Sequence, residues 1–235
     1  MSELVVRNLT AGYGQAAVVK GLSLEVGAGE IVGLLGRNGA GKTTTLRAIS
    51  GMLVHVEGVV TLGGVALTGP AYRRARNGLG QVLEGRSVFP GLSVRQNLRA
   101  ARVSVGDVES IFPELSSKLG LKAGTLSGGE QQMLAVARAI CRQPGVLLLD
   151  EVSFGLAPII CERIYRQLDT LRASGMAVLV VEQYLHHVAE FVDRALVMHQ
   201  GRVTLEMPGR DVLRRAAEIE DIYLSKQTRL DASQR

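Results

Sequence analysis

The sequence contains few aromatic residues, few cysteines and no long apolar segment. Aromatic side chains make up 4% of its 235 residues, too few for an obvious base-stacking surface. The net charge is +5, but the basic residues are scattered along the chain, so we do not expect nucleic acid as a partner. Cys141 and Cys161 are isolated, with neither metal-ligand spacing nor a disulfide framework, so we expect reduced thiols that carry no chemistry.

The apolar runs are also short. Segments such as "GVLLLD" and "AVLVVE" fall far below the roughly 20 residues that span a bilayer. The N-terminal stretch "MSELVVRNLT" lacks the apolar core of a signal peptide. We therefore expect a cytoplasmic protein that is neither secreted by that route nor membrane-spanning.

Hydrophobic residues, by contrast, make up 46% of the chain, enough for the core of one large domain, or of one domain with a subdomain. Short runs rich in leucine and β-branched residues alternate with helical patterns, which predicts an α/β fold with a largely parallel sheet. The expected strands cover residues 4–6, 31–35, 59–62, 146–149, 177–181 and 195–198. Between residues 81 and 126 the strand signal fades, and "SVRQNLRAARV" and "VESIFPELSSKL" predict short helices of an insertion.

A glycine-rich segment follows the second expected strand. "GLLGRNGAGKTTTLRAIS" places an apolar strand, the pattern G-x-x-x-x-G-K-T and a helical pattern in the order that a P-loop requires. In such a loop, backbone N–H groups wrap the β-phosphate, a lysine supplies positive charge to the β- and γ-phosphate oxygens, and a hydroxyl binds Mg²⁺. Here Lys42 is the predicted cation and Thr43 the predicted Mg²⁺ ligand. The whole predicted cradle comprises Gly36, Arg37, Asn38, Gly39, Ala40, Gly41, Lys42, Thr43 and Thr44.

Two acidic residues, Asp150 and Glu151, end the apolar run "VLLLDE". At a strand end beside a P-loop, Asp150 would hold Mg²⁺, directly or through water, and Glu151 could accept a proton from the attacking water. Two acids after a strand are otherwise usually a solvated strand end. Together with the P-loop they predict a nucleotide hydrolase and leave ATP and GTP as alternatives.

A capped helix with an open N-terminus is expected from "LSGGEQQMLAVARAI". Ser127 and Glu130 have capping-box spacing, and apolar residues then recur at helical intervals. A helix N-terminus carries partial positive charge and unpaired N–H groups, which Gly128 and Gly129 would let a ligand approach closely. Taken alone, the segment leaves open whether this end binds a ligand or is merely well capped.

The motifs "GRNGAGKTT", "LSGGEQQ" and "LLLDE", in this order, resemble the ATP-binding subunits of ABC transporters, and the similarity runs over nearly the whole chain. The resemblance implies that two subunits meet head to tail, so that Ser127, Gly128 and Gly129 of one close on the γ-phosphate held by the other. It also implies that Tyr13 of "AGYG" stacks on adenine, which favours ATP over GTP.

Finer motifs are similar to the branched-chain amino acid importer group, which includes related amide and urea importers: "EGRSVFPGLSVRQNL", "IFPEL", "GLAP" and "VVEQ". In that group Glu84 takes the place of a loop glutamine that senses Mg²⁺ and the membrane partner, and Gln183 takes the place of the switch histidine. Because glutamine cannot change charge with pH, Gln183 would only hydrogen-bond the γ-phosphate or orient water. Val152 and Leu83 stand where proline is usual, which frees φ and restores a backbone donor near the catalytic acid.

The expected architecture is a P-loop NTPase core with an N-terminal antiparallel β portion (residues 1–81 and 140–225), a helical subdomain with the signature (82–139) and a polar tail (226–235). The resemblance implies a peripheral protein on the inner face of the cell membrane, which dimerises with an identical or different ATPase subunit around ATP and Mg²⁺. It would dock on membrane-embedded permease subunits near Glu84 and Phe89, with a solute-binding protein as an indirect partner.

Two other functions stay open at this point. A soluble ABC protein acting on ribosomes or DNA usually has tandem cassettes or a coiled-coil insertion, and the sequence has neither. A regulatory nucleotide-binding module without turnover is kept open by Val152 and Gln183. A phosphate-release assay with and without the permease distinguishes this module from a transport ATPase.

Overall fold

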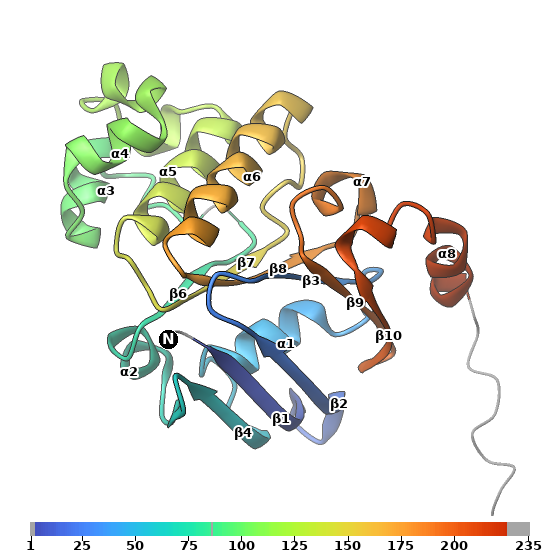
Figure 1. Ribbon diagram of the computed structural model, residues 1–235. Helices are drawn as coiled ribbons and strands as arrows, with labels where there is room; N and C mark the ends of the chain where they lie inside the picture. Colours follow the sequence, from blue (N-terminus) through green and yellow to red (C-terminus); the bar gives the residue numbers. More distant parts are fainter. Residues whose placement is uncertain (1–2, 86, 225–235) are drawn as a thin grey trace, which may run out of the picture.

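A computed structural model describes residues 3–85 and 87–224, which form two β-sheets and the helices around them (Figure 1). The larger sheet has the strand order β10-β9-β3-β8-β7-β6, with all neighbours parallel except β10 and β9. Its strands are β3 (Ile31–Leu35), β6 (Leu79–Val82), β7 (Val146–Asp150), β8 (Ala177–Glu182), β9 (Arg194–His199) and β10 (Arg202–Pro208). The fold is therefore α/β, as predicted, and the polar tail at 226–235 lies outside the described residues.

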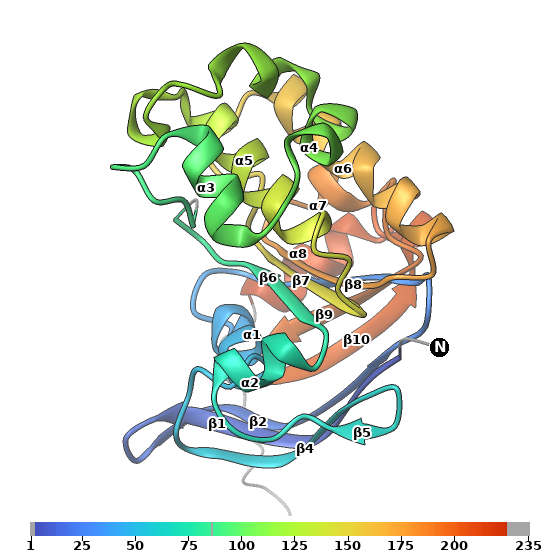
Figure 2. The same ribbon diagram turned by 90° about the vertical axis from the view of Figure 1, so that its left-hand side faces the viewer.

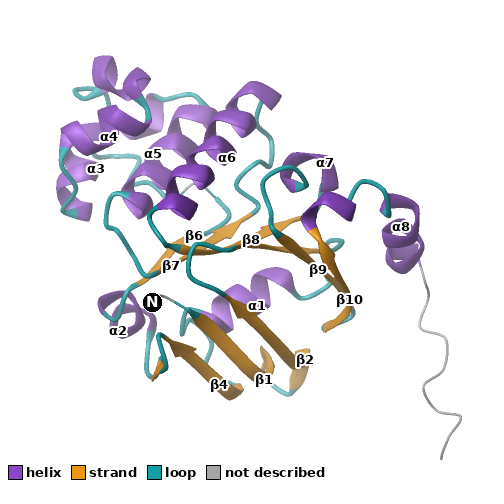
Figure 3. Ribbon diagram, viewed as in Figure 1, coloured by secondary structure: helices purple, strands orange, loops and turns teal. Residues whose placement is uncertain are grey.

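The smaller sheet is antiparallel and has the order β2-β1-β4-β5. It contains β1 (Leu4–Tyr13), β2 (Ala16–Val26), β4 (Val56–Leu62) and β5 (Val65–Ala66). Figure 3 shows this sheet as a separate layer, with helix α1 (Lys42–Ile49) between it and the larger sheet.

The central strands of the larger sheet are buried along their whole length because both faces are covered. Every residue of β3, β7 and β8 is buried. Within β3, Ile31 and Leu35 pack into the hydrophobic cluster that contains α5 (Gly128–Ile140) and α6 (Pro158–Ala173). Val32 and Leu34 pack into the cluster on the opposite face, with α1 and the small sheet. This two-sided burial explains why these strands are continuous apolar runs in the sequence.

Short helices between β6 and α5 gather at one end of the molecule, away from the small sheet (Figure 2). They are α3 (Val94–Ala101), α4 (Val105–Ile111) and the 3₁₀ segments Pro113–Lys118 and Ala123–Thr125. Ser93 and Gln96 form a capping box at α3, and the Ser104 side chain caps α4. The helix expected over 108–119 is wrong in detail: α4 ends at Ile111, because Pro113 lacks the N–H that would continue it.

The remaining helices are α2 (Ala71–Arg76), α7 (Leu185–Val188), the 3₁₀ segment Gly209–Asp211 and α8 (Ala216–Leu224). Among the described residues, no helix is both long enough and apolar enough to cross a membrane.

Candidate functional site

The glycine-rich loop connects the end of β3 to the start of α1. Gly36 must be glycine, because a Cβ there would lie 2.6 Å from the carbonyl oxygen of Met198 in β9. Gly41 has a φ of 108°, a left-handed conformation that side chains disfavour, and it is the N-cap residue of α1. The loop thus packs tightly over the carboxyl end of β3 and places Lys42 in the first turn of α1.

At the carboxyl end of β3, Lys42 comes together with Asp150, the last residue of β7, and with Glu151, which follows it. The parallel strands β3 and β7 both flank β8, so their carboxyl ends lie on the same side of the sheet. Lys42 Nζ lies 3.1 Å from Glu151 Oε1 and donates to the carbonyl oxygen of Arg37 at 3.2 Å. Thr43 Oγ1 donates to Asp150 Oδ1 at 3.2 Å. Two adjacent pairs that are distant from each other in sequence, Lys42–Thr43 and Asp150–Glu151, therefore share one polar centre.

Asp150 has the electrostatics of a cation ligand. Its side chain is buried, and this desolvation raises its pKa to about 6, against the lowering effect of the Thr43 hydrogen bond and Lys42. The carboxylates of Glu151 and Glu84 also contribute to this raised pKa. Asp150 Oδ2 is buried without a hydrogen-bond partner. An unpartnered carboxylate oxygen beside a threonine hydroxyl fits a hard cation such as Mg²⁺, which prefers oxygen ligands.

A cavity of about 310 Å³ opens above this centre. It collects most of the predicted loop residues together with Glu84 and Glu151, which come from two other segments. Two apolar residues that sequence reasoning did not place in the site, Val18 of β2 and Phe154, complete the wall. The full lining is Val18, Asn38, Gly39, Gly41, Lys42, Thr43, Thr44, Glu84, Glu151 and Phe154.

Gln183 and Tyr13 are not part of this lining. Gln183 borders a second hollow of about 300 Å³, which it shares with Arg37, Asn38 and Ala40. Since Asn38 lines both hollows, they are neighbours on the same loop. Tyr13 ends β1 with 49% of its surface exposed, and its hydroxyl accepts a hydrogen bond from Arg47 Nη1 of α1 at 3.1 Å.

The turn after Asp150 forms without the proline that is usual in it. Glu151 has a φ of 44°, an uncommon left-handed conformation for a non-glycine residue. Its N–H donates to the carbonyl oxygen of Val181, and its carbonyl oxygen accepts from Phe154 N, at 3.0 and 3.1 Å. Val152 is 1% exposed and packs into the core. Hydrogen bonds and an apolar anchor therefore shape this turn.

The capping box at the start of α5 has the predicted geometry. Ser127 N donates to Glu130 Oε2 at 2.9 Å, and Glu130 N donates to Ser127 Oγ at 3.3 Å. Lys118 Nζ lies 2.7 Å from Glu130 Oε1 and, as the leading cause, lowers the pKa of that carboxyl. Ser127, Gly128 and Gly129 are not among the residues that line the cavity at Lys42.

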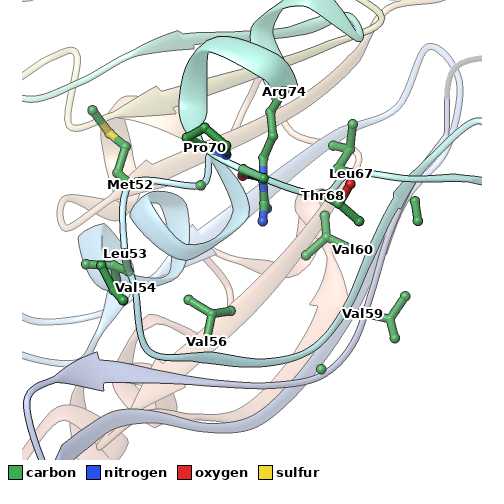
Figure 4. A pocket seen from close by; sticks show the side chains of 14 residues that line it. Met52, Leu53, Val54, Val56, Val59, Val60, Leu67, Thr68, Pro70 and Arg74 are labelled. Carbon is green, nitrogen blue, oxygen red and sulfur yellow. Dashed lines mark hydrogen bonds between the residues drawn. The ribbon is translucent and has the colours of Figure 1, made fainter.

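A larger groove, of about 580 Å³, lies between α2, β4 and the segment after α1 (Figure 4). Its labelled side chains are mostly apolar, and Arg74 of α2 extends into it. The Arg74 guanidinium donates to the carbonyl oxygens of Ala48 and Ile49 at 3.1 and 2.7 Å, which are the C-terminal end of α1. The groove is thus at the end of α1 opposite the phosphate loop.

The sequence comparisons agree with this geometry. A family profile described as "ABC transporter" matches residues 19–153. The chain belongs to the ABC transporter family. Within the family it is an ATP-hydrolysing subunit, and its glycine-rich loop is that of a nucleotide-binding domain.

Two relatives in the ABC transporter family cover almost the whole chain. The high-affinity branched-chain amino acid transport ATP-binding protein BraG of Pseudomonas aeruginosa is 39% identical over 222 residues, which are 90% of this chain and 95% of BraG. The lipopolysaccharide export system ATP-binding protein LptB of Escherichia coli K12 is 33% identical over 243 residues, covering 98% of this chain and 100% of LptB. The name of LptB states export of lipopolysaccharide, whereas the name of BraG states transport of branched-chain amino acids without a direction, so family membership leaves direction and solute open.

Solved structures of ABC proteins share the fold. A nucleotide-free ATP-binding cassette from an ABC transporter superposes with a TM-score of 0.84 at 23% identity, covering 96% of this chain and 100% of that one. A bacterial Atm1-family ABC exporter with ATP bound gives a TM-score of 0.80 at 26% identity, covering 97% of this chain and 43% of that one. The two-sheet architecture is therefore that of an ABC cassette.

Proposed function

We propose that this ABC ATPase drives the import of branched-chain amino acids or related small amides through a membrane permease. The convergence of Lys42, Thr43 and Glu151 on one cavity, with Asp150 accepting a hydrogen bond from Thr43, carries the hydrolytic part of the proposal. The solute class rests on the higher identity to BraG, 39% against 33% for LptB, and the import direction rests on the resemblance of the sequence motifs to the branched-chain amino acid importer group.

In the proposed mechanism, the backbone of the loop and the Lys42 ammonium bind the β- and γ-phosphates of ATP. Thr43 and Asp150 would hold Mg²⁺, which would neutralise phosphate charge. Glu151 orients the attacking water and accepts its proton. Glu84 lines the same cavity and would contact the metal ion, and Gln183 would hydrogen-bond the γ-phosphate from the neighbouring hollow.

In the free protein, Lys42 pairs with Glu151 at 3.1 Å, so the proposed base and the phosphate-binding cation neutralise each other. The incoming phosphates compete with Glu151 for this ammonium and release the carboxylate toward water. This exchange keeps the base inactive until nucleotide is present.

The signature and the adenine contact complete the proposed site. Because Ser127, Gly128 and Gly129 do not line the cavity of their own loop, we assign them to the γ-phosphate of a second ATPase subunit. Tyr13 offers an aromatic ring to the adenine, with its hydroxyl held by Arg47.

Phe89 is the proposed contact with the permease, on the inner face of the cell membrane. Its side chain is half exposed, and the Arg138 guanidinium lies 5.0 Å from its ring centroid. The fully buried Asn97 holds the Phe89 backbone at both polar atoms, accepting from its N–H at 2.9 Å and donating to its carbonyl oxygen at 3.0 Å. An exposed aromatic side chain on a fixed backbone is suited to an interface, where it loses little conformational entropy on binding.

Transport by the reconstituted complex tests the proposal. The ATPase and its permease are placed in proteoliposomes with the solute-binding protein, and ATP-dependent uptake of labelled leucine, a short amide and urea is compared. We expect uptake of one of these solutes with wild-type protein and none with Glu151→Gln. ATP-dependent extraction of a lipid in place of uptake would contradict the import assignment. Phosphate release that is independent of every solute would contradict coupling to transport.

A further inference from the structure

A buried carboxylate joins the two segments that carry Glu151 and Gln183. Glu182 is the last residue of β8 and is 1% exposed. Its Oε1 accepts hydrogen bonds from Ser153 Oγ at 2.9 Å, from Ser153 N at 3.3 Å and from the Tyr165 hydroxyl. Ser153 belongs to the turn that starts at Glu151, and Glu182 directly precedes Gln183.

These bonds secure a turn with an unusual backbone. Glu151 keeps a φ of 44°, and residues other than glycine keep such angles when the surrounding structure enforces them. Its N–H is fixed to the carbonyl oxygen of Val181 in β8. Ser153 adds two bonds from the same turn to the next residue of that strand, Glu182. Side-chain and backbone bonds together fix where the Glu151 carboxylate lies relative to β8.

The Glu182 carboxylate is linked to two helices, directly to α6 through Tyr165 and to α7 by way of Ser153. Tyr165 comes from α6, is fully buried and stacks on Phe191 with ring centroids 5.4 Å apart. Ser153 Oγ lies 2.9 Å from His187 Nδ1 of α7. Burial raises the pKa of Glu182 and of Tyr165, so this network carries a desolvation cost that an apolar side chain at position 182 would avoid. The presence of these buried polar groups is therefore better explained by the geometry that their hydrogen bonds impose than by a gain in stability.

We propose that Glu182 is a positioning residue for ATP hydrolysis. Through Ser153 it holds the turn that carries Glu151, and through its own backbone it fixes the start of the segment that carries Gln183. The proposal rests on Glu151 being the general base of the proposed function. The one bond between Glu182 and the phosphate loop in the described residues is a backbone bond, from Gly36 N to the Glu182 carbonyl oxygen at 3.3 Å, and side-chain substitutions keep it. Loss of the side-chain bonds should therefore lower kcat and leave nucleotide affinity near that of the wild type.

Three substitutions, singly and in one combination, test whether Ser153 and Glu182 position Glu151. Ser153→Ala removes the Oγ bond to Glu182 and keeps the backbone N–H bond, whereas Glu182→Met removes both of these bonds and the bond from Tyr165. Each variant should lower kcat about tenfold or more while KM and ADP affinity stay within about threefold. The double variant should be no slower than Glu182→Met, since Glu182→Met already removes every bond that Ser153 donates to position 182. Glu182→Gln keeps an oxygen acceptor in almost the same shape and should restore kcat to within about threefold of wild type.

Leu168→Ala is the matched control, because Leu168 is fully buried in α6 and packs in the same apolar core. It should lower Tm and leave kcat unchanged. If Leu168→Ala and Ser153→Ala lose kcat equally at equal loss of Tm, the network is merely structural and the proposal is overturned. Wild-type kcat in folded Ser153→Ala and Glu182→Met overturns it as well. If Glu151→Gln keeps its activity, Glu151 is not the general base and that part of the proposed function is refuted. If Glu151→Gln is inactive while Ser153→Ala is fully active, only the positioning role of Glu182 is refuted.

Discussion

Replacement of Glu151 by glutamine should tighten nucleotide binding in addition to blocking turnover. In the free protein the Glu151 carboxylate lies 3.1 Å from Lys42 Nζ, with side chains that are 12% and 4% exposed. The phosphates of an incoming nucleotide need the same ammonium, so wild-type protein has to break this ion pair before Lys42 serves its ligand. Glutamine keeps the shape of the side chain and removes the charge, so the variant gives up a weaker contact.

The size of the gain follows from the burial of the pair. Two unit charges about 4 Å apart attract with ~4 kcal/mol at an effective dielectric constant of ~20. A neutral hydrogen bond contributes only about 1 kcal/mol, and the bound phosphates restore most of the attraction that Lys42 loses. We expect a net gain of about 1–2 kcal/mol, which is roughly 5–30-fold in affinity. Lys42→Ala should instead weaken nucleotide binding, because the phosphates then lose the ammonium that binds them.

Titration calorimetry with ADP measures this effect. By family resemblance the closed dimer needs a γ-phosphate, so ADP separates the ion-pair effect from dimer closure. Adenosine is the matched control ligand, since it carries no phosphate and its affinity should be the same in wild type and Glu151→Gln. Equal ADP affinities in wild-type and Glu151→Gln protein would refute the ion pair as a competitor for the phosphates.

Three other sets of variants separate the proposed roles. Lys42→Ala on one subunit with Ser127→Arg on the other should keep half of the ATPase sites, whereas both changes on one subunit paired with an unmodified one should keep none. Equal activity in the two dimers would exclude a signature acting in trans. Because the Asp150 pKa is raised from 3.8 to about 6, the folded metal-free protein binds this proton more tightly than the unfolded chain does. Its stability in urea should therefore fall as the pH rises from about 4 to about 6, by at most ~3 kcal/mol; identical pH profiles for wild type and Asp150→Asn would contradict this. Tyr13→Leu should weaken ATP about fivefold or more through lost stacking on adenine and leave GTP less affected, and an unchanged preference for ATP over GTP would remove Tyr13 from the base site.

The strands of the larger sheet that are covered on both faces could be predicted from the sequence, whereas the outermost strands of the two sheets could not. β3, β7 and β8 are short apolar runs because both of their faces are buried. β10, at an edge, alternates between exposed and partly buried residues, and its sequence "RVTLEMP" carries no continuous apolar run. β2 pairs with β1 through several register shifts, so its length depends on a partner strand rather than on its own pattern.

The convergence of the phosphate loop and the acids after β7 could be predicted for a geometric reason. Carboxyl ends of parallel strands meet at the same edge of a sheet, so a loop after β3 and an acid after β7 come together once both are recognised as strands. The catalytic and binding roles of the site residues stay predictions, as do the subdomain boundaries at residues 82 and 139.

The finer contacts of the site depend on tertiary placement. Val18 reaches the cavity because β2 passes beside the loop at Gly41, and nothing in the local sequence marks it. The pairing of Lys42 with Glu151 and the bonds from Ser153 to Glu182 join residues more than 25 positions apart. Such contacts arise from how the strands are ordered, which a single sequence read by local pattern does not specify.

Phosphate release by wild-type protein and Glu151→Gln, measured in a single turnover with Mg²⁺-ATP bound to both, tests the central claim most directly. Binding of labelled ATP to each protein is checked first, so that a loss of release reports the chemical step. The account predicts that Glu151→Gln binds ATP and releases phosphate about 100-fold or more slowly than wild type, because its amide cannot accept the proton of the attacking water. Release from ATP-loaded Glu151→Gln at a rate near that of wild type would contradict it.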